Sequence, residues 1–153
     1  MDVRKGYNNI RIKKGDEWKA AFKTNEGLFE PLIMFFGLCN APATFQSFMD
    51  HIFKEVKRKG YCIIYMDDIL IFSSNWEHHR QAVRDVLEVL RRNKLCLKAE
   101  KCEFHKSEME FLGFIVGNGQ VKMDQGKITA VRDWKSPRNK KELQTFLGFA
   151  NFY

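Results

Sequence analysis

Two adjacent acidic residues, Asp67 and Asp68, stand between two short apolar runs near the middle of the chain. Residues 61–64 and 69–72 are rich in β-branched and aromatic side chains, which favour extended backbone. Two such runs separated by so few residues are typical of two strands joined by a very tight turn. The pattern therefore predicts a β-hairpin that carries both carboxylates at its tip.

Two interpretations of this acidic tip stay open from the local sequence. Asp is common in turns because its side chain hydrogen-bonds the nearby backbone, so one interpretation is a simple polar turn. Asp67-Asp68 lacks, however, the Gly that the favoured two-residue hairpin turns require. The other interpretation is a site for a hard cation, since Mg²⁺ takes carboxylate oxygens when substrate phosphates complete its coordination. A third acidic residue nearby would decide between the two.

Length and charge limit the class of protein. A chain of 153 residues with a hydrophobic fraction of 44% fits one globular domain. Twenty-six Lys and Arg against 19 Asp and Glu give a net charge of +7, which favours a polyanionic partner such as nucleic acid. A solvated basic face would give the same balance. The charged N-terminus and the lack of a long apolar run predict a soluble intracellular protein without a membrane partner.

The four cysteines show no C-x-x-C pair, and no His lies at zinc spacing beside them. A single Cys and a single His cannot close a four-ligand zinc site, so the pattern predicts reduced thiols. These residues are Cys39, Cys62, Cys96 and Cys102.

Periodicity along the rest of the chain predicts an α+β fold with a mainly antiparallel sheet and packed helices. Strands are expected at residues 8–13, 18–23, 28–36, 95–97 and 110–116. One amphipathic helix is expected to start near Pro42 and to end at Gly60. Further helices are expected after a capping box at residues 74–77, after Asp124 and after Asn139. The apolar stripe of the first helix consists of Phe45, Phe48, Met49, Ile52, Phe53 and Val56.

Four motifs occur in the order and approximate spacing seen in reverse transcriptases, and the match extends over nearly the whole chain. Each motif alone is weak, and the combination is very specific. Residues 27–30, 101–104 and 142–153 further resemble the gypsy class of LTR retrotransposon polymerases. The four motifs are Asp2-x-x-x-Gly6-Tyr7, residues 36–45 from Phe36-Gly37 to Thr44-Phe45, Tyr65-Met66-Asp67-Asp68, and Phe111-Leu112-Gly113-Phe114.

This resemblance implies a reverse transcriptase domain over residues 1–153, made of the palm and part of the fingers and truncated at both ends. The implied activity is RNA-directed DNA polymerisation, in which dNTPs are added to a primer 3′-end on an RNA or DNA template. Two Mg²⁺ ions, with Mn²⁺ as the alternative, are the implied cofactors. Their implied ligands are Asp2, Asp67, Asp68 and the carbonyl of Val3. Without the resemblance, Asp2 would be read as a fraying terminal residue.

The resemblance also assigns substrate contacts. Tyr7 is similar to a steric gate that excludes the ribose 2′-hydroxyl, and otherwise would be an ordinary strand aromatic. Lys101 aligns with a lysine that protonates the pyrophosphate, with Lys98 as the alternative and a solvated lysine as the bland interpretation. The implied triphosphate, sugar and primer contacts are, in chain order, Arg4, Lys5, Gly6, Phe36, Tyr65, Met66, Leu112 and Gly113.

Partners and competing functions follow from the same comparison. The implied partners are a primed RNA or DNA template, dNTPs, and the RNase H and integrase domains of a parent Pol polyprotein, in a cytoplasmic particle or the nucleus. The isolated chain is expected to be a weak or inactive polymerase. The alternatives are a catalytically inactive nucleic-acid-binding relic, which would be expected to lose its acids first, and a two-metal nuclease, which would not need Tyr7.

Overall fold

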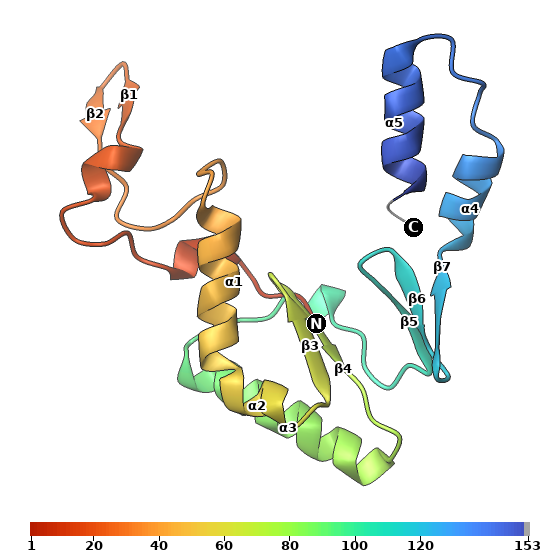
Figure 1. Cartoon of the computed structure of the whole chain (residues 1–153). Coiled ribbons are helices and arrows are strands. Elements are labelled where there is room, and N and C mark those ends of the chain that lie inside the picture. The colour runs from red at the N-terminus through yellow and green to blue at the C-terminus, as the bar shows by residue number, and fades with distance from the viewer. Residues whose placement is uncertain (152–153) are drawn as a thin grey trace. The chain divides into compact units, whose positions relative to one another are not determined.

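The computed structural model describes residues 1–151, which divide into two compact units. The first unit comprises residues 1–103 and the second begins at Phe104 (Figure 1). Each unit combines helices with antiparallel strands, so the expected α+β class is confirmed. The assignment of residues 1–153 to a single reverse transcriptase domain stays a prediction.

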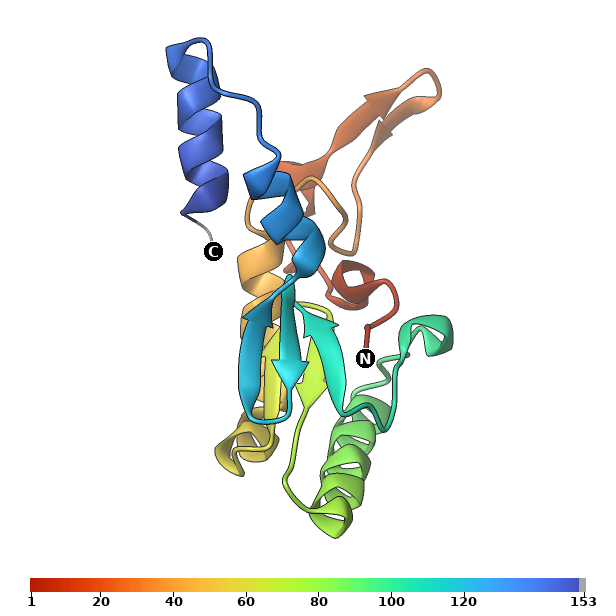
Figure 2. The same ribbon diagram turned by 90° about the vertical axis from the view of Figure 1, so that its right-hand side faces the viewer.

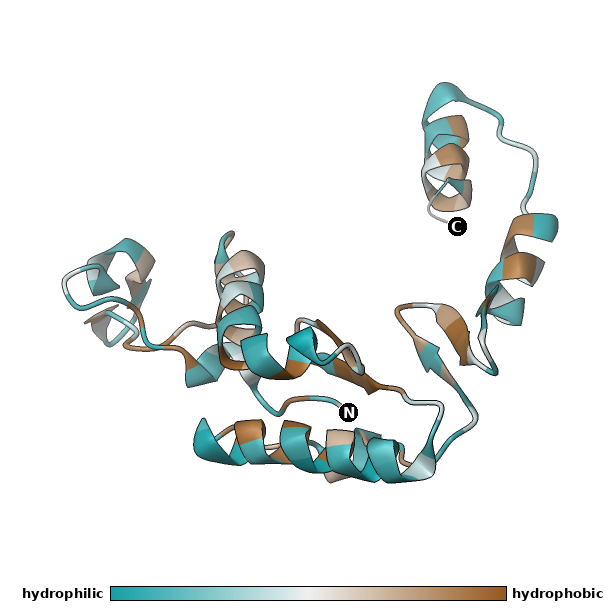
Figure 3. Cartoon of the chain, turned by 60° about the horizontal axis from the view of Figure 1, so that its bottom comes forward, coloured by the Kyte–Doolittle hydropathy of each residue, from teal (hydrophilic) through white to brown (hydrophobic). Residues whose placement is uncertain are grey.

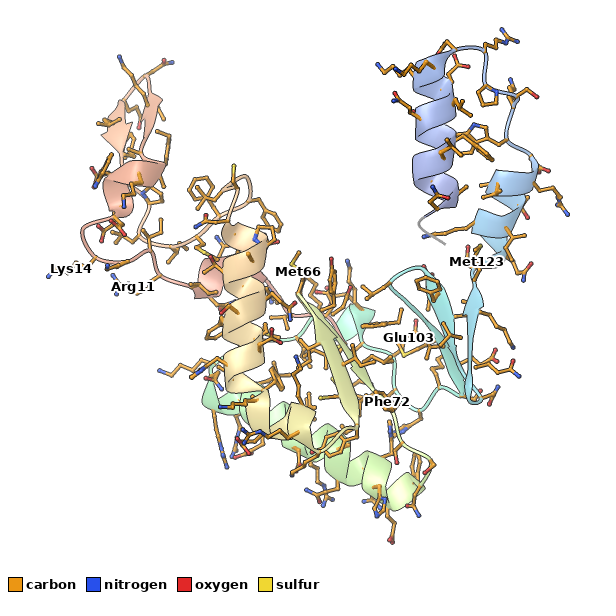
Figure 4. The ribbon with its side chains drawn as sticks, in the orientation of Figure 1. Arg11, Lys14, Met66, Phe72, Glu103 and Met123 are labelled. Atoms are coloured by element: carbon orange, nitrogen blue, oxygen red, sulfur yellow. The ribbon has the colours of Figure 1, made fainter. Side chains whose placement is uncertain are left out.

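The predicted acidic hairpin is present in the first unit. Strand β3 (Cys62–Tyr65) pairs antiparallel with β4 (Asp68–Ile71), and Tyr65 lies opposite Asp68. This register leaves only Met66 and Asp67 in the turn, where Met66 adopts a left-handed φ of 54°. Met66 lies at the turn end of the hairpin and Phe72 beyond its open end (Figure 4). One acid therefore sits in the turn and the other begins β4.

The core of the first unit lies between this hairpin and three helices. Cys62 and Ile64 are buried whereas the alternate residues Ile63 and Tyr65 are exposed, which is the period of a strand with one covered face. The helices that contact the hairpin or each other are α1 (Ala41–Ile52), α2 (Lys54–Arg58) and α3 (Trp76–Arg92). The hairpin thus has a rigid support beneath its acidic tip.

The predicted apolar stripe of the first helix is confirmed, and its predicted continuity is wrong. Phe45, Met49, Phe53 and Val56 are all buried. The helix breaks at Phe53, whose φ of −96° and ψ of 7° depart from helical values, so α1 and α2 are separate. Phe53 is completely buried, and its amide still donates to the carbonyl of Met49 at 3.0 Å, so the distortion is confined to one residue.

Helix α3 begins one residue later than its sequence pattern predicted. Asn75, rather than Ser74, is the N-cap, and its side-chain oxygen accepts from the amides of Glu77 and His78. Ala82, Val86 and Leu90 are buried on one face, while Trp76 in the first turn is exposed. The alternation of apolar and polar residues along α3 is visible in Figure 3.

An ionic cluster joins α3 to the start of β3. Lys59 and Tyr61 both donate to Oδ2 of Asp85, and Gln81 donates to its Oδ1 at 2.7 Å. The bonds from Lys59 and Tyr61 lower the pKa of Asp85 to about 2. Burial, followed by the bond to Asp85, raises the pKa of Tyr61 to about 12. The cluster therefore requires an ionised Asp85 and a neutral Tyr61.

Replacing Asp85 by Asn is expected to lower the free energy of unfolding by about 1 kcal/mol at neutral pH, because its partners are partly solvated. The folded-state pKa lies below the unfolded value, so this stabilisation is present above about pH 4 and is lost as the pH falls through about 2. Urea unfolding at several pH values measures the difference. Glu55→Gln, which breaks only the exposed Glu55–Arg58 pair, is the control and should change stability little.

The expected strands at residues 8–13 and 18–23 are largely wrong. Residues 6–9 and 17–20 form the short 3₁₀ helices η1 (Gly6–Asn9) and η2 (Glu17–Ala20). The hairpin of this region is instead β1 (Phe22–Thr24) with β2 (Gly27–Phe29). A short alternating stretch does not by itself distinguish a turn from a strand, and an isolated bridge between Arg11 and Ile33 is the strand-like pairing of residues 8–13.

The second unit holds a three-stranded antiparallel sheet, followed by two helices (Figure 2). The expected single strand at residues 110–116 is two strands, because Leu112 and Gly113 both take positive φ in a tight turn. Asp124 and Asn139 cap the two helices as predicted. The elements are β5 (Glu108–Phe111), β6 (Phe114–Gly117), β7 (Gln120–Met123), α4 (Gln125–Arg132) and α5 (Lys140–Ala150).

The four cysteines are free thiols: Cys62 is buried, Cys102 is half-buried, and Cys39 and Cys96 are exposed. The remaining short helix of the first unit is η3 (Ala99–Lys101). Of the helices within residues 1–151, none has the length and apolar character needed to cross a membrane.

Candidate active site

The N-terminal residues lie beside the acidic hairpin as an added strand. Asp2 forms an isolated antiparallel bridge with Asp68. The amide of Val3 donates to the carbonyl of Asp67 at 2.9 Å, and Val3 is completely buried. The first carboxylate of the predicted triad is therefore held next to the other two by main-chain hydrogen bonds, and Asp2 is not a fraying terminal residue.

A second segment pairs with the other edge of these residues. The amide of Arg4 donates to the carbonyl of Cys96 at 2.7 Å, and the amide of Lys98 donates to the carbonyl of Asp2 at 2.9 Å. The expected strand at residues 95–97 is thus reduced to one bridge, between Val3 and Leu97. Main-chain partners on both edges fix Asp2.

The three carboxylates repel one another. Partial desolvation, followed by the charges of Asp67 and Asp2, raises the pKa of Asp68. Like charges directly opposite each other in a sheet destabilise it. This edge of the sheet therefore concentrates negative charge that needs a cation.

Lysines provide part of that positive charge. Lys98 Nζ lies 2.7 Å from Asp2 Oδ1, and Lys101 Nζ lies 3.5 Å from Asp2 Oδ2. The Asp2 carboxylate raises the pKa of Lys98. Asp2 Oδ1 is nevertheless buried and accepts no well-directed hydrogen bond within the described part of the chain. The Lys98 ammonium is therefore close enough to Asp2 Oδ1 for an ion pair, but the angle between the two groups is not that of a hydrogen bond.

The donor chemistry fits a divalent cation. Carboxylate oxygens are what Mg²⁺ and Mn²⁺ take, and a buried anionic oxygen without a directed donor can accept a cation without losing a hydrogen bond. Within residues 1–151, however, no three His, Cys, Asp or Glu side chains converge into a ready ligand set. The Asp2 carboxylate contacts Lys98 and Lys101 instead. The main chain of the site is therefore in place, but the acidic side chains do not yet surround a common point.

A cluster of three aromatic rings, Tyr7, Phe36 and Phe45, lies next to the acidic turn. The Tyr7 ring centroid is 4.8 Å from that of Phe36 and 5.5 Å from that of Phe45, and the Tyr7 hydroxyl donates to Met66 Sδ at 3.8 Å. Phe45 is completely buried, whereas Phe36 is 74% exposed. Tyr7 therefore connects the core to an open surface beside the hairpin turn, which is where a substrate-facing ring would have to lie.

The segment before Tyr7 is shaped by close packing. A Cβ on Gly6 would lie 2.7 Å from the Phe45 ring, so only Gly fits there. Lys5 takes a left-handed φ of 51°. The Arg4 amide is bonded to the Cys96 carbonyl, so the expected triphosphate contact of Arg4 would have to come from its side chain. The expected contacts of Lys5 and Gly6 stay predictions.

Gln46 is a site residue that the sequence pattern did not reveal. Its Oε1 accepts from the amide of Met66 at 2.7 Å, and its Nε2 donates to the carbonyl of Ile64 at 3.3 Å and to Asp50 Oδ1 at 3.1 Å. It therefore ties the acidic turn to α1. Its position beside the apolar stripe did not indicate this role, because a Gln on a helix is ordinarily a solvent-exposed residue.

Replacing Gln46 by Ala is expected to lower the primer-extension rate of the full-length parent about tenfold, because the turn that carries Asp67 loses two anchoring hydrogen bonds. Template binding should change little. Single-turnover extension with a labelled primer, compared with Gln120→Ala in the second unit, measures the effect. A rate equal to that of the parent would show that the hairpin needs no support from α1.

The expected primer contacts fall in both units. Tyr65 is 51% exposed at the end of β3, next to Met66 in the turn. Leu112 and Gly113 form the β5–β6 turn of the second unit, where Leu112 is 40% exposed. Their proposed contacts with a primer stay predictions.

An acidic hairpin bridged to a third carboxylate and supported by helices defines the palm of a template-dependent polymerase. Solved structures share this fold. A foamy viral protease-reverse transcriptase in complex with double-stranded DNA superposes with a TM-score of 0.87 at 24% identity, over 99% of this chain and 26% of that one. The same enzyme with an RNA/DNA hybrid gives a TM-score of 0.82 at 24% identity, over 99% of this chain and 20% of that one.

The chain belongs to the reverse transcriptase (RNA-dependent DNA polymerase) family, whose model matches residues 1–116. It is 41% identical over 152 residues to the Tf2-3 and Tf2-7 transposon polyproteins of Schizosaccharomyces pombe (strain 972 / ATCC 24843). The match covers 99% of this chain and 11% of each polyprotein. The chain therefore spans about a tenth of the length of these relatives, and the expected kinship with gypsy-class retrotransposons is confirmed.

Proposed function

We propose that this chain carries the polymerising centre of an RNA-directed DNA polymerase, which adds dNTPs to a primer 3′-end on an RNA or DNA template. One observation carries the proposal: the bridge between Asp2 and Asp68, together with the Val3–Asp67 bond, holds the backbones of three acidic residues side by side at the turn end of a supported hairpin. Nucleotidyl transfer depends mainly on the positioning of the reacting groups and on compensation of the phosphate charge. The main-chain bonds that hold Asp2 beside the hairpin provide the positioning.

Asp2, Asp67, Asp68 and the Val3 carbonyl are the proposed ligands of two Mg²⁺ ions, with Mn²⁺ as a substitute. When bound, the ions would activate the primer hydroxyl and stabilise the leaving pyrophosphate. The protein's part is to hold the carboxylates in place through the main-chain bonds of residues 1–4 and through Gln46. Partial desolvation, followed by repulsion from Asp67 and Asp2, raises the pKa of Asp68, and a bound cation would offset that repulsion.

The remaining groups are assigned to the substrate. Tyr7 and Phe36 are proposed to line the sugar pocket, and Lys5 and Gly6 the triphosphate. Lys101 is the better candidate for the proton donor to pyrophosphate, because its side chain is 60% exposed and its ammonium is 3.5 Å from Asp2. Lys98 is held closer to Asp2 and is less exposed. Tyr65, Met66, Leu112 and Gly113 are proposed to contact the primer.

The partners are proposed by analogy with the relatives. The foamy viral enzyme is described in complex with double-stranded DNA and with an RNA/DNA hybrid, and a primed template is proposed to bind here. The S. pombe relatives are transposon polyproteins, and we extend this to RNase H and integrase domains in the parent of this chain, in a cytoplasmic particle or the nucleus. Alone, the 153-residue chain is proposed to be weak or inactive.

Primer extension by the full-length parent tests the function. The parent is incubated with an RNA template, a labelled DNA primer, dNTPs and Mg²⁺, and the products are resolved by length. Extended primers support the proposal. Binding without extension would indicate an inactive nucleic-acid-binding relic, and shortened primers would indicate a nuclease.

A further inference from the structure

Three charged residues lie in one row across the sheet of the first unit. Asp2 bridges Asp68 on one side. On the other side Val3 pairs with Leu97, and this antiparallel register places Asp2 directly opposite Lys98. Directly opposite residues in a sheet project from the same face. Asp2 therefore has a neighbour of like charge, Asp68, on one side and a neighbour of opposite charge, Lys98, on the other.

The backbone of Lys98 is fixed from both sides. Its amide donates to the carbonyl of Asp2 at 2.9 Å. Its carbonyl accepts from the amide of Lys101 at 3.0 Å and from Cys102 Sγ at 3.2 Å. Its side chain is 27% exposed, and its ammonium lies 2.7 Å from Asp2 Oδ1. A long, ordinarily flexible side chain is thus attached to an anchored main chain, which lowers the entropy cost of holding the ion pair.

We infer that Lys98 is a resident counter-ion of Asp2: a positioning residue that holds this carboxylate while no divalent cation is bound and that a cation must displace. The inference rests on the proposed function, since it takes Asp2 as a cation ligand. Lys98 offsets the repulsion between Asp2 and Asp68 in the cation-free protein. The same contact holds Asp2 Oδ1 against the Lys98 ammonium, in agreement with the absence of a converged ligand set within residues 1–151.

The direction of the change in cation affinity distinguishes a counter-ion role of Lys98 from a purely structural one. If Lys98 only supported the fold, removing its charge would weaken cation binding. If Lys98 competes with the cation, removing its charge leaves Asp2 free and tightens binding. A partly solvated ion pair gives an expected change of about three- to tenfold in the dissociation constant.

The experiment is a Mn²⁺ titration of the 153-residue chain without nucleic acid, followed by the electron paramagnetic resonance signal of free Mn²⁺. Lys98→Gln is expected to bind Mn²⁺ about three- to tenfold more tightly than the unaltered chain. Lys98→Arg, which keeps the charge, should remain close to the unaltered chain. In thermal unfolding with a chelator, Lys98→Gln should melt at a lower temperature, and Mn²⁺ should raise its melting temperature by more than that of the unaltered chain.

Controls separate this inference from the proposed function. Lys122→Gln removes a lysine that pairs with Glu108 in the second unit and should leave Mn²⁺ binding unchanged. Asp67→Asn should weaken binding both in the unaltered chain and when combined with Lys98→Gln. If Lys98→Gln binds Mn²⁺ equally or more weakly while Asp67→Asn also weakens binding, the counter-ion role is wrong and the cation site stands. If the unaltered chain binds no Mn²⁺ at millimolar concentration, both the cation site and the counter-ion role fail.

Discussion

Replacing Asp67 by Asn in the full-length parent is expected to reduce primer extension by roughly a thousandfold or more. The substitution keeps the size of the side chain and the main-chain bond from Val3 to Asp67, so the sheet should remain assembled. What is lost is a negative oxygen that a divalent cation would take. We expect primer-template binding to depend on basic residues elsewhere and therefore to stay within about twofold of the parent.

Single-turnover extension with saturating dNTP measures this effect, and filter binding of the labelled primer-template measures affinity. Asp16→Asn is the matched control, because within residues 1–151 the Asp16 carboxylate pairs with the exposed Lys19 near η2. If Asp67→Asn extends the primer at the parent rate, the Asp67 carboxylate has no role in the reaction. A parallel loss of binding would indicate a folding defect instead.

Replacing Tyr7 by Ala is expected to raise the incorporation of ribonucleotides relative to deoxyribonucleotides by roughly tenfold to a hundredfold. The Tyr7 ring rests on the buried Phe45 and stands beside the exposed Phe36, so it cannot retreat when a bulkier sugar enters. A rigid ring of this kind excludes a 2′-hydroxyl by steric clash, and removing it removes the clash.

Steady-state incorporation of a single rNTP and the corresponding dNTP gives the ratio. Tyr7→Phe is the control, since it keeps the ring and loses only the weak contact from the hydroxyl to Met66 Sδ. The Phe variant should discriminate as the parent does. If the Ala variant keeps the parent ratio while the chain remains folded, Tyr7 is a packing residue and the sugar is selected elsewhere.

Local patterns in the sequence predicted those parts of the fold in which the pattern and the packing agree. The acidic hairpin was predictable because apolar runs on both sides of Asp67 and Asp68 leave room for only a tight turn. The buried stripe of α1 was predictable from its spacing. The break at Phe53 was not, because Phe53 stands within an uninterrupted apolar stripe of helical spacing. The 3₁₀ segments near the N-terminus were missed because short alternating stretches do not distinguish a turn from a strand.

The candidate site was predictable in its residue types and not in its contacts. Asp2 was proposed from a motif, and nothing local showed that it would be paired on both edges. Lys98 was an alternative to Lys101 for proton donation, and only the antiparallel register shows that it lies opposite Asp2. Gln46 had no signal, because its role depends on a turn that is distant in sequence.

The pairing of residues 1–4 with two distant segments has a consequence for how the first unit acquires its site. Hairpins and helices form from contacts that are local in sequence, whereas these bonds close long loops, so we expect them to form later in folding. The same bonds can open locally while α1, α3 and the hairpin stay folded. A population of molecules with an intact core and a detached Asp2 would appear native by helix content and would be unable to polymerise, so the active fraction of a preparation would be lower than its folded fraction.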